Sequence, residues 1–148
     1  MATPEELQAQ LNYEVAVYRE QLTMLKRETE RVSLTTMDLA NALRTVESLG
    51  TERVLMPIGG GSMIKGTVSE TNVLMPIGAE YMLEMKKEQA VVELNRRIEA
   101  TKKAVERLNE EFTKIMTRLQ QVSGQLEQLD SQVRISERGE ESMKEDYL

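Results

Sequence analysis

The sequence predicts a mostly α fold with a small β part: a long antiparallel coiled-coil helical hairpin interrupted by two β-hairpins. Two runs of apolar residues with heptad spacing, one in each half of the chain, predict the helices. Between them, a glycine-rich segment contains the hexapeptide VLMPIG twice, at residues 54–59 and 73–78, and this segment predicts the hairpins. We expect one domain over residues 1–148.

The first helix is expected over residues 5–49, which contain neither glycine nor proline. Thr3 is a suitable N-cap, and Pro4 fits the first helical turn because its missing N–H would have no partner there. Apolar residues then alternate at spacings of three and four, which is typical of a coiled coil. Gly50 is expected to end the helix.

A second run of the same spacing predicts a helix over residues 86–135. If the chain folds back so that Val46 faces Val91, the apolar positions of the two helices meet. Thr36 then faces Thr101, so that two of the polar exceptions share one layer, and we take this match as support for the register. The alternative is that threonine is simply tolerated at both positions.

The middle segment, residues 51–85, holds most of the glycines of the chain and half of its methionines. Short apolar runs predict four strands, at residues 54–58, 63–68, 73–77 and 81–85. Turns at residues 59–61 and 78–79 would join these strands as two hairpins.

The hairpins are expected to form an oligomerisation surface. Two short hairpins cannot bury much apolar surface by themselves, and the seam of the coiled coil is already occupied by its own helices. Pro57 and Pro76 have no N–H to donate, so each is expected at an edge or a bulge of its ladder. The residues expected on this surface are Val54, Met56, Ile58, Met63, Ile64, Val68, Val73, Met75, Ile77, Tyr81 and Leu83. The alternative is a small self-contained sheet that caps the helical hairpin.

Composition argues against several classes of function. The chain has no cysteine and no histidine, which removes disulfides, thiolate nucleophiles, imidazole bases and the commonest zinc ligands. We therefore expect no catalytic residues, no metal site, no cofactor and no enzyme. A net charge of −6 argues against nucleic acid as a partner, and no apolar run approaches the length of a membrane span. A cytoplasmic location fits these features.

Two local patterns have simple interpretations. Residues 59–62 with Lys65 could suggest a phosphate-binding loop, but the order of that motif is absent and no long helix follows, so a hairpin turn is expected. Glu93 and Arg97 are expected to form one of several solvated charge pairs on the flanks of the coiled coil.

The arrangement of helix, two hairpins and helix resembles the α-class subunit of prefoldin in its archaeal form. The similarity is carried by VLMPIGGGSMIKGTV and NVLMPIGAEYMLE, which look like the two-hairpin core of that family. The helices match in their heptad pattern, so the resemblance spans residues 5–135. Pro76 is a departure, because the family usually has a non-proline residue there, and it puts one hydrogen bond of the second hairpin in doubt.

The resemblance implies a hexamer of two α-class and four β-class subunits, in which the hairpins build a β-barrel hub that carries six coiled-coil arms. It also implies an ATP-independent chaperone that holds unfolded polypeptides at the arm tips and passes them to a group II chaperonin. The implied partners are β-class prefoldin subunits, a group II chaperonin and unfolded clients, with no nucleic acid and no membrane. A prefoldin-like filament, and a scaffold or tether coiled coil without clients, stay open as alternatives.

The tip follows from the register, which places both chain ends at the end of the coiled coil farthest from the hairpins. Apolar residues there have few partners, because the first helix begins only near Pro4. The residues expected to bind clients are Leu7, Leu11, Leu126, Leu129, Val133 and Ile135. The alternative for Leu11 and Leu126 is an ordinary place in the seam. Residues 136–148 carry more acidic than basic side chains and are expected to form a disordered tail.

Overall fold

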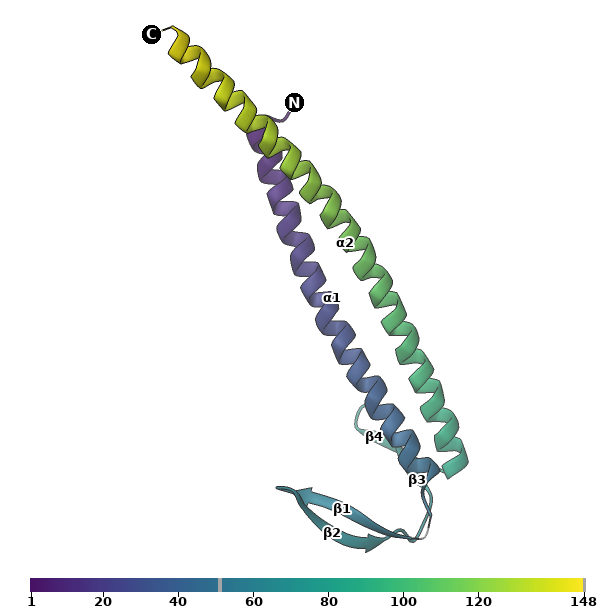
Figure 1. Ribbon diagram of the computed structural model, residues 1–148. Helices are drawn as coiled ribbons and strands as arrows, with labels where there is room; N and C mark the ends of the chain where they lie inside the picture. Colours follow the sequence, from purple (N-terminus) through teal and green to yellow (C-terminus); the bar gives the residue numbers. More distant parts are fainter. Residues whose placement is uncertain (51, 148) are drawn as a thin grey trace. The chain divides into compact units, whose positions relative to one another are not determined.

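The computed structural model describes residues 1–50 and 52–147 (Figure 1). Thr51, at the start of the expected hairpin segment, and Leu148, at the end of the expected tail, lie outside the described residues. The elements are α1 (Pro4–Glu47), β1 (Arg53–Gly59), β2 (Ser62–Thr67), β3 (Val73–Gly78), β4 (Tyr81–Met85) and α2 (Lys87–Asp146). The predicted fold class is confirmed, because two antiparallel β-hairpins lie between two long helices in the order of the chain.

Thr3 is the N-cap of α1, as the sequence predicts, and with Glu6 it forms a capping box. The backbone N–H of Glu6 donates to Thr3 Oγ1 at 3.2 Å, and the backbone N–H of Thr3 donates to the Glu6 carboxylate at 3.1 Å. Each side chain thus satisfies one backbone donor that the helix leaves without a partner. Pro4 is the first helical residue, and Gly50 follows shortly after the last one.

The second helix is longer than predicted. It ends at Asp146, so the prediction of a disordered tail from residue 136 is wrong. Helix propagation needs no new nucleus once many turns have formed, and the glutamate, lysine, arginine and methionine side chains of this segment are good helix formers. Gly139 is the poorest helix former of this segment, and one exposed glycine costs only about 1 kcal/mol relative to alanine. Acidic composition alone was therefore a poor guide to disorder.

The chain divides into two compact units, and both helices contribute to each. The first unit comprises Met1–Glu30 and Glu106–Leu148. Its core contains Leu11 and Val15 of α1 packed with Val122 and Leu129 of α2, which is the antiparallel seam that the heptad spacing predicts. Gln8 Nε2 donates a hydrogen bond to Asp130 Oδ1 at 2.6 Å and closes this seam near the start of α1.

The second unit comprises Arg31–Val105 and contains all four strands. In its coiled-coil part the hydroxyl oxygens of Thr36 and Thr101 lie 2.8 Å apart, so the predicted threonine layer is confirmed as a hydrogen-bonded pair. At the hairpin end, the Nζ atom of Lys87 donates to the carbonyl of Leu49 at 2.9 Å. This bond satisfies a carbonyl just beyond the last turn of α1 and joins the end of α1 to the start of α2.

The repeated hexapeptide forms two equivalent strands. In the first hairpin Pro57 pairs with Met63, and in the second Pro76 pairs with Met82. Each ladder shifts register immediately after its proline, so a bulge follows at corresponding places in both hairpins. Each hairpin is a separate two-stranded sheet in the described chain. The prediction that each proline lies at an edge or a bulge is thereby confirmed.

The two hairpin turns share one backbone conformation but differ in sequence. In the first turn Gly60 and Gly61 have φ values of 57° and 80°. In the second turn the corresponding Ala79 and Glu80 have φ values of 47° and 64°, in the left-handed region that disfavours residues with a Cβ. Two positive values at the centre of a two-residue turn are typical of type I′, which suits the twist of hairpin strands.

Candidate functional site

The hairpins carry the densest group of exposed apolar side chains in the described chain, and we call this group the hairpin surface. Its exposed members are Leu55, Met56, Ile58, Met63, Ile64, Leu74, Ile77, Tyr81, Met82 and Leu83. Of the remaining predicted residues, Val54, Val68 and Val73 are half-buried. Exposed apolar side chains gathered on so short a segment favour an interaction site.

Three members of the hairpin surface were missed from sequence, namely Leu55, Leu74 and Met82. They are 61%, 61% and 56% exposed, as much as the residues that were predicted. They alternate along the strands with predicted residues such as Met56, so they belong to the opposite sheet face. The available signal was that these strands lack the polar alternation of a half-solvated sheet, which indicates that both faces are meant to be covered.

One face of the second hairpin packs on the helices of its own chain, which corrects part of the prediction. Met75 is only 4% exposed and clusters with Val46, Ala90 and Leu94. Ala90 is completely buried, and its small side chain allows the strand to approach the helix closely. Met75 is therefore a core residue of the chain and offers little surface to a second subunit. The self-contained alternative holds for this one face.

The corresponding face of the first hairpin has no such cover. Met56, which occupies the place of Met75 in the repeat, is 45% exposed, and its ladder partner Ile64 is 49% exposed. The end of the Met56 side chain lies over Gly66, where a Cβ would collide with it. The two hairpins thus have the same register but different surroundings within the chain.

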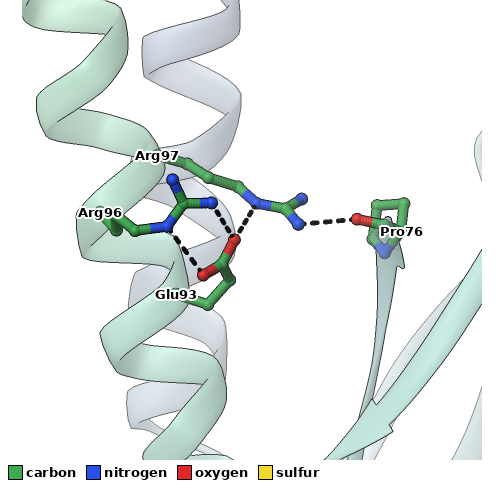
Figure 2. A network of polar contacts seen from close by, with 4 residues as sticks. All are labelled: Pro76, Glu93, Arg96 and Arg97. Atoms are coloured by element: carbon green, nitrogen blue, oxygen red, sulfur yellow. Dashed lines mark hydrogen bonds and ion pairs between the residues drawn. The ribbon is translucent and has the colours of Figure 1, made fainter. Parts of the chain in front are cut away.

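A polar network ties the second hairpin to α2 (Figure 2). Arg97 Nη2 donates to the carbonyl of Pro76 at 2.7 Å, and Arg97 Nε donates to Glu93 Oε1 at 2.8 Å. Arg96 also binds Glu93, through Nη2 at 2.6 Å and Nε at 3.0 Å. The prediction that Glu93 and Arg97 are merely a solvated pair is wrong, since both side chains are about one quarter exposed and Arg97 reaches the hairpin.

The charge distribution of this network holds Glu93 ionised. Hydrogen bonds from Arg96, which has the larger effect, and from Arg97 lower the pKa of Glu93 from 4.5 to about 2. Glu93 in turn raises the pKa of Arg96. The carboxylate therefore accepts hydrogen bonds from both guanidinium groups over the whole physiological pH range.

The predicted client-binding residues separate into buried and exposed groups. Leu11 and Leu129 are 7% and 9% exposed and belong to the core of the first unit, which corrects their assignment as uncovered tip residues. Leu126 is half-buried against the same core. Leu129 is covered because α1 already begins at Pro4, so its first turns still oppose this part of α2.

What remains exposed near the chain ends is a smaller apolar group, which we call the chain-end surface. Leu7 is 41% exposed and Ile135 is 71% exposed, while Val133 is half-buried. Of these three, Val133 lines a hollow together with Thr3, Pro4, Glu5, Leu129, Gln132, Ser136, Glu137 and Glu140. Within this unit α2 continues past the start of α1, so its last turns lack a helical partner (Figure 1).

A metal site and a membrane span are two further kinds of site to consider among the described residues. Along them, no three acidic side chains gather closely enough to hold a metal ion. None of the helices in the described part has the length and apolar character needed to cross a membrane. Gly59, Gly60 and Gly61 have positive φ values and form a hairpin turn that leads into β2, so they do not form a loop before a helix.

A family model described as "Prefoldin subunit" matches residues 18–132 of this chain. That range includes most of both helices and both hairpins. The chain belongs to the prefoldin family. Members of this family are chaperones rather than enzymes, and prefoldin subunits form oligomers with β-type subunits.

The similar curated relatives are prefoldin α subunits of archaea. The α subunit of Methanococcus aeolicus is 37% identical over 102 residues, which are 68% of this chain and 70% of the relative. That of Pyrobaculum islandicum is 34% identical over 118 residues, 78% of this chain and 89% of the relative. That of Methanospirillum hungatei is 27% identical over 143 residues, 94% of this chain and 93% of the relative. The resemblance to the α class is therefore confirmed.

Solved prefoldin structures share the fold. Filamentous prefoldin from Methanocaldococcus jannaschii superposes with a TM-score of 0.66 at 22% identity, covering 77% of this chain and 98% of that chain. The prefoldin β subunit from Thermococcus strain KS-1 superposes with a TM-score of 0.60 at 19% identity, covering 86% and 96% of the two chains. At these identities the likeness concerns the fold of a prefoldin subunit and nothing finer.

Proposed function

We propose that this prefoldin subunit acts in the cytoplasm as part of an ATP-independent chaperone. Its hairpins join β-class subunits in a hexamer of two α and four β chains, with a β-barrel hub. Its chain-end surface, together with those of the other subunits, captures unfolded polypeptides, and the complex delivers them to a group II chaperonin. Membership of the family supports a chaperone role, and the exposed hairpin surface is the observation that carries the assembly.

The hairpin surface argues for assembly because its strands are poorly suited to stand alone. A two-stranded hairpin is marginal in water, and each hairpin here is an isolated pair of strands. Ile58 and Ile77, at the bulges, are 67% and 57% exposed, although isoleucine is among the residues most often buried. Strand edges that lack a partner also favour the addition of further strands. A hub built from several hairpins would cover both the faces and the edges.

The chain-end surface supports client capture in a similar way. Leu7, Val133 and Ile135 are accessible without unfolding the seam, because Leu11 and Leu129 close the core beneath them. Burying one such side chain contributes about 1.5–3 kcal/mol. A few of these contacts give weak and reversible binding, which suits a protein that must hand its client to another machine.

Co-expression with a β-class prefoldin subunit tests the assembly. The native mass of the purified complex should correspond to two α and four β chains. The variant Ile58→Asp with Ile77→Asp should lose that complex while its helical circular dichroism is retained, because two charges would be buried in the hub. The control Leu34→Asp changes a residue that is 62% exposed on α1 and should assemble normally.

The same measurement separates the alternatives. A mass that grows with protein concentration would support a filament instead of a closed hexamer. Normal assembly of the double aspartate variant would show that the hairpins are not the hub. A complex that assembles but never protects an aggregating client would support a scaffold or tether.

A further inference from the structure

Arg97 is the only side chain of the described helices that is seen to hydrogen-bond to a strand backbone. Its guanidinium group uses two of its donors at once, Nε toward Glu93 and Nη2 toward the carbonyl of Pro76 (Figure 2). The planar fork of arginine suits two acceptors on different sides, which a lysine ammonium group serves less rigidly. A helix residue is thus bonded to the strand at the residue that directly precedes the bulge of the second hairpin.

Glu93 holds the arginine in this position. Its carboxylate also accepts both hydrogen bonds from Arg96, and the Glu93 side chain is only 24% exposed. A carboxylate fixed by two guanidinium groups has little freedom to rotate, and it therefore restricts the rotamers of Arg97. Charge-assisted hydrogen bonds of this kind are roughly twice as strong as neutral ones.

The first hairpin lacks this attachment, although its sequence begins with the same hexapeptide. Pro57 corresponds to Pro76, and no side chain of the described residues donates to its carbonyl. Met56 is 45% exposed where Met75 is 4% exposed. Among the described residues, the second hairpin is therefore held by both an apolar cluster and a directional bond, and the first hairpin is held by neither.

We propose that Arg97 is a positioning residue that fixes the direction of the β3–β4 hairpin relative to the adjacent part of α2. In the assembly, the second hairpin then sets the direction in which the adjacent part of α2 leaves the hub. The first hairpin is free to adjust its position to the neighbouring subunit. This use in the assembly rests on the proposed function, whereas the attachment itself is a property of the single chain.

Hydrogen exchange of the unassembled chain tests the attachment. Loss of one charge-assisted hydrogen bond in Arg97→Met should speed exchange of the β3–β4 amides about tenfold or more, while the β1–β2 amides keep their rates. Arg96→Met is the matched control, because Arg96 binds the same carboxylate but is not bonded to the hairpin, and it should have a much smaller effect. Arg97→Lys, which keeps the charge without the fork, should fall between the parent and Arg97→Met.

Unchanged β3–β4 rates in Arg97→Met would overturn the proposal, and so would an equal effect of Arg96→Met. If Arg97→Met disrupts the second hairpin altogether, the Arg97→Lys variant decides: an intermediate rate confined to β3–β4 supports the proposal, and parental rates overturn it.

A second measurement addresses the assembled complex. The chain has no cysteine, so Gln128→Cys introduces a single site for a spin label in each α subunit. With Arg97→Met, the label-to-label distances should spread over a wider range at unchanged native mass, whereas Arg96→Met should keep the parental distribution. An unchanged distribution in Arg97→Met would overturn the role in assembly. If the parent chain forms no complex, the proposed function fails, and the exchange result still decides the attachment.

Discussion

Ala79 and Glu80 occupy backbone conformations that glycine adopts in the first hairpin. A residue with a Cβ in the left-handed region costs roughly 1–2 kcal/mol. The double variant Ala79→Asn with Glu80→Gly places the preferred asparagine-glycine pair in a type I′ turn. We expect it to raise the free energy of unfolding of the chain by about 1–2 kcal/mol, measured by chemical denaturation.

The converse variant provides the control for this turn. Gly60→Ala with Gly61→Glu gives the first hairpin the turn sequence of the second, and it should lower stability by a similar amount. Equal stability of both double variants and the parent would show that the positive φ values carry no strain in either turn.

Glu93 gives the chain a specific dependence on pH. Its pKa is about 2 in the folded chain against 4.5 as its ordinary value, so folding favours the ionised form. The contribution to stability is therefore complete above pH 4.5 and is lost as the pH falls toward 2. We expect the stability difference between the parent and Glu93→Gln to shrink across this window when thermal unfolding is followed at several pH values.

The matched control for this titration is Glu88→Gln. Glu88 lies in the first turn of the same helix and makes no hydrogen bond to an arginine among the described residues. Its substitution should leave the pH profile close to that of the parent. A parent and a Glu93→Gln variant that lose stability in parallel from pH 5 to pH 2 would contradict the assignment.

At the scale of elements, the chain-end surface can be changed without opening the core of the coiled coil. The triple variant Leu7→Ser, Val133→Ser and Ile135→Ser should keep the helical content and the assembly. It should protect an aggregating client less well, because each lost apolar contact is worth about 1.5–3 kcal/mol. Light scattering of a denatured client in the presence of the assembled complex measures this effect.

A second triple variant controls for apolar surface in general. Met24→Ser, Leu34→Ser and Met37→Ser changes side chains on α1 that are 62%, 62% and 61% exposed, away from the chain ends in sequence. Client protection should survive in this variant. If both triple variants protect as well as the parent does, the client site lies elsewhere in the complex.

Much of the fold could be predicted because it depends on periodicity. Heptad spacing located the apolar stripe of each helix. The Thr36–Thr101 pair supported the register, because two threonine hydroxyls can hydrogen-bond to each other, whereas neither can bond to a leucine side chain. Glycines and the repeated hexapeptide located the hairpins. These signals are local or depend on a simple fold-back of the chain, so they can be read without knowing any side-chain contact.

The errors arose where contacts cross between elements. Ala90 looks like any helical alanine, and only the structure shows that its small size admits Met75. Arg97 looks like one member of an i,i+4 pair, since spacing along a helix says nothing about a strand that folds back beside it. For the same reason, the sequence suggested that Leu129 was exposed, whereas in the structure the first turns of α1 cover its part of α2.

For the whole molecule, the proposed activity depends on exposed apolar surfaces, so we expect client protection not to depend on nucleotide. Client protection by the assembled complex should be the same with and without ATP and Mg²⁺. The glycine run that might have held a phosphate is the turn of a hairpin. A reproducible nucleotide requirement in the purified complex, with chaperonin absent, would contradict this expectation.

The presence of two hairpins in one chain has a kinetic consequence. Residues 68–72 join β2 to β3, and a segment of this length spans at most about 20 Å. In the proposed assembly, once one hairpin has docked, the other would meet its site at a local concentration that a short tether raises to the millimolar range. A hairpin that dissociates from one neighbour would therefore rebind before the other hairpin of the same chain dissociates. An α subunit should consequently leave the complex far more slowly than a chain with a single hairpin of equal intrinsic affinity.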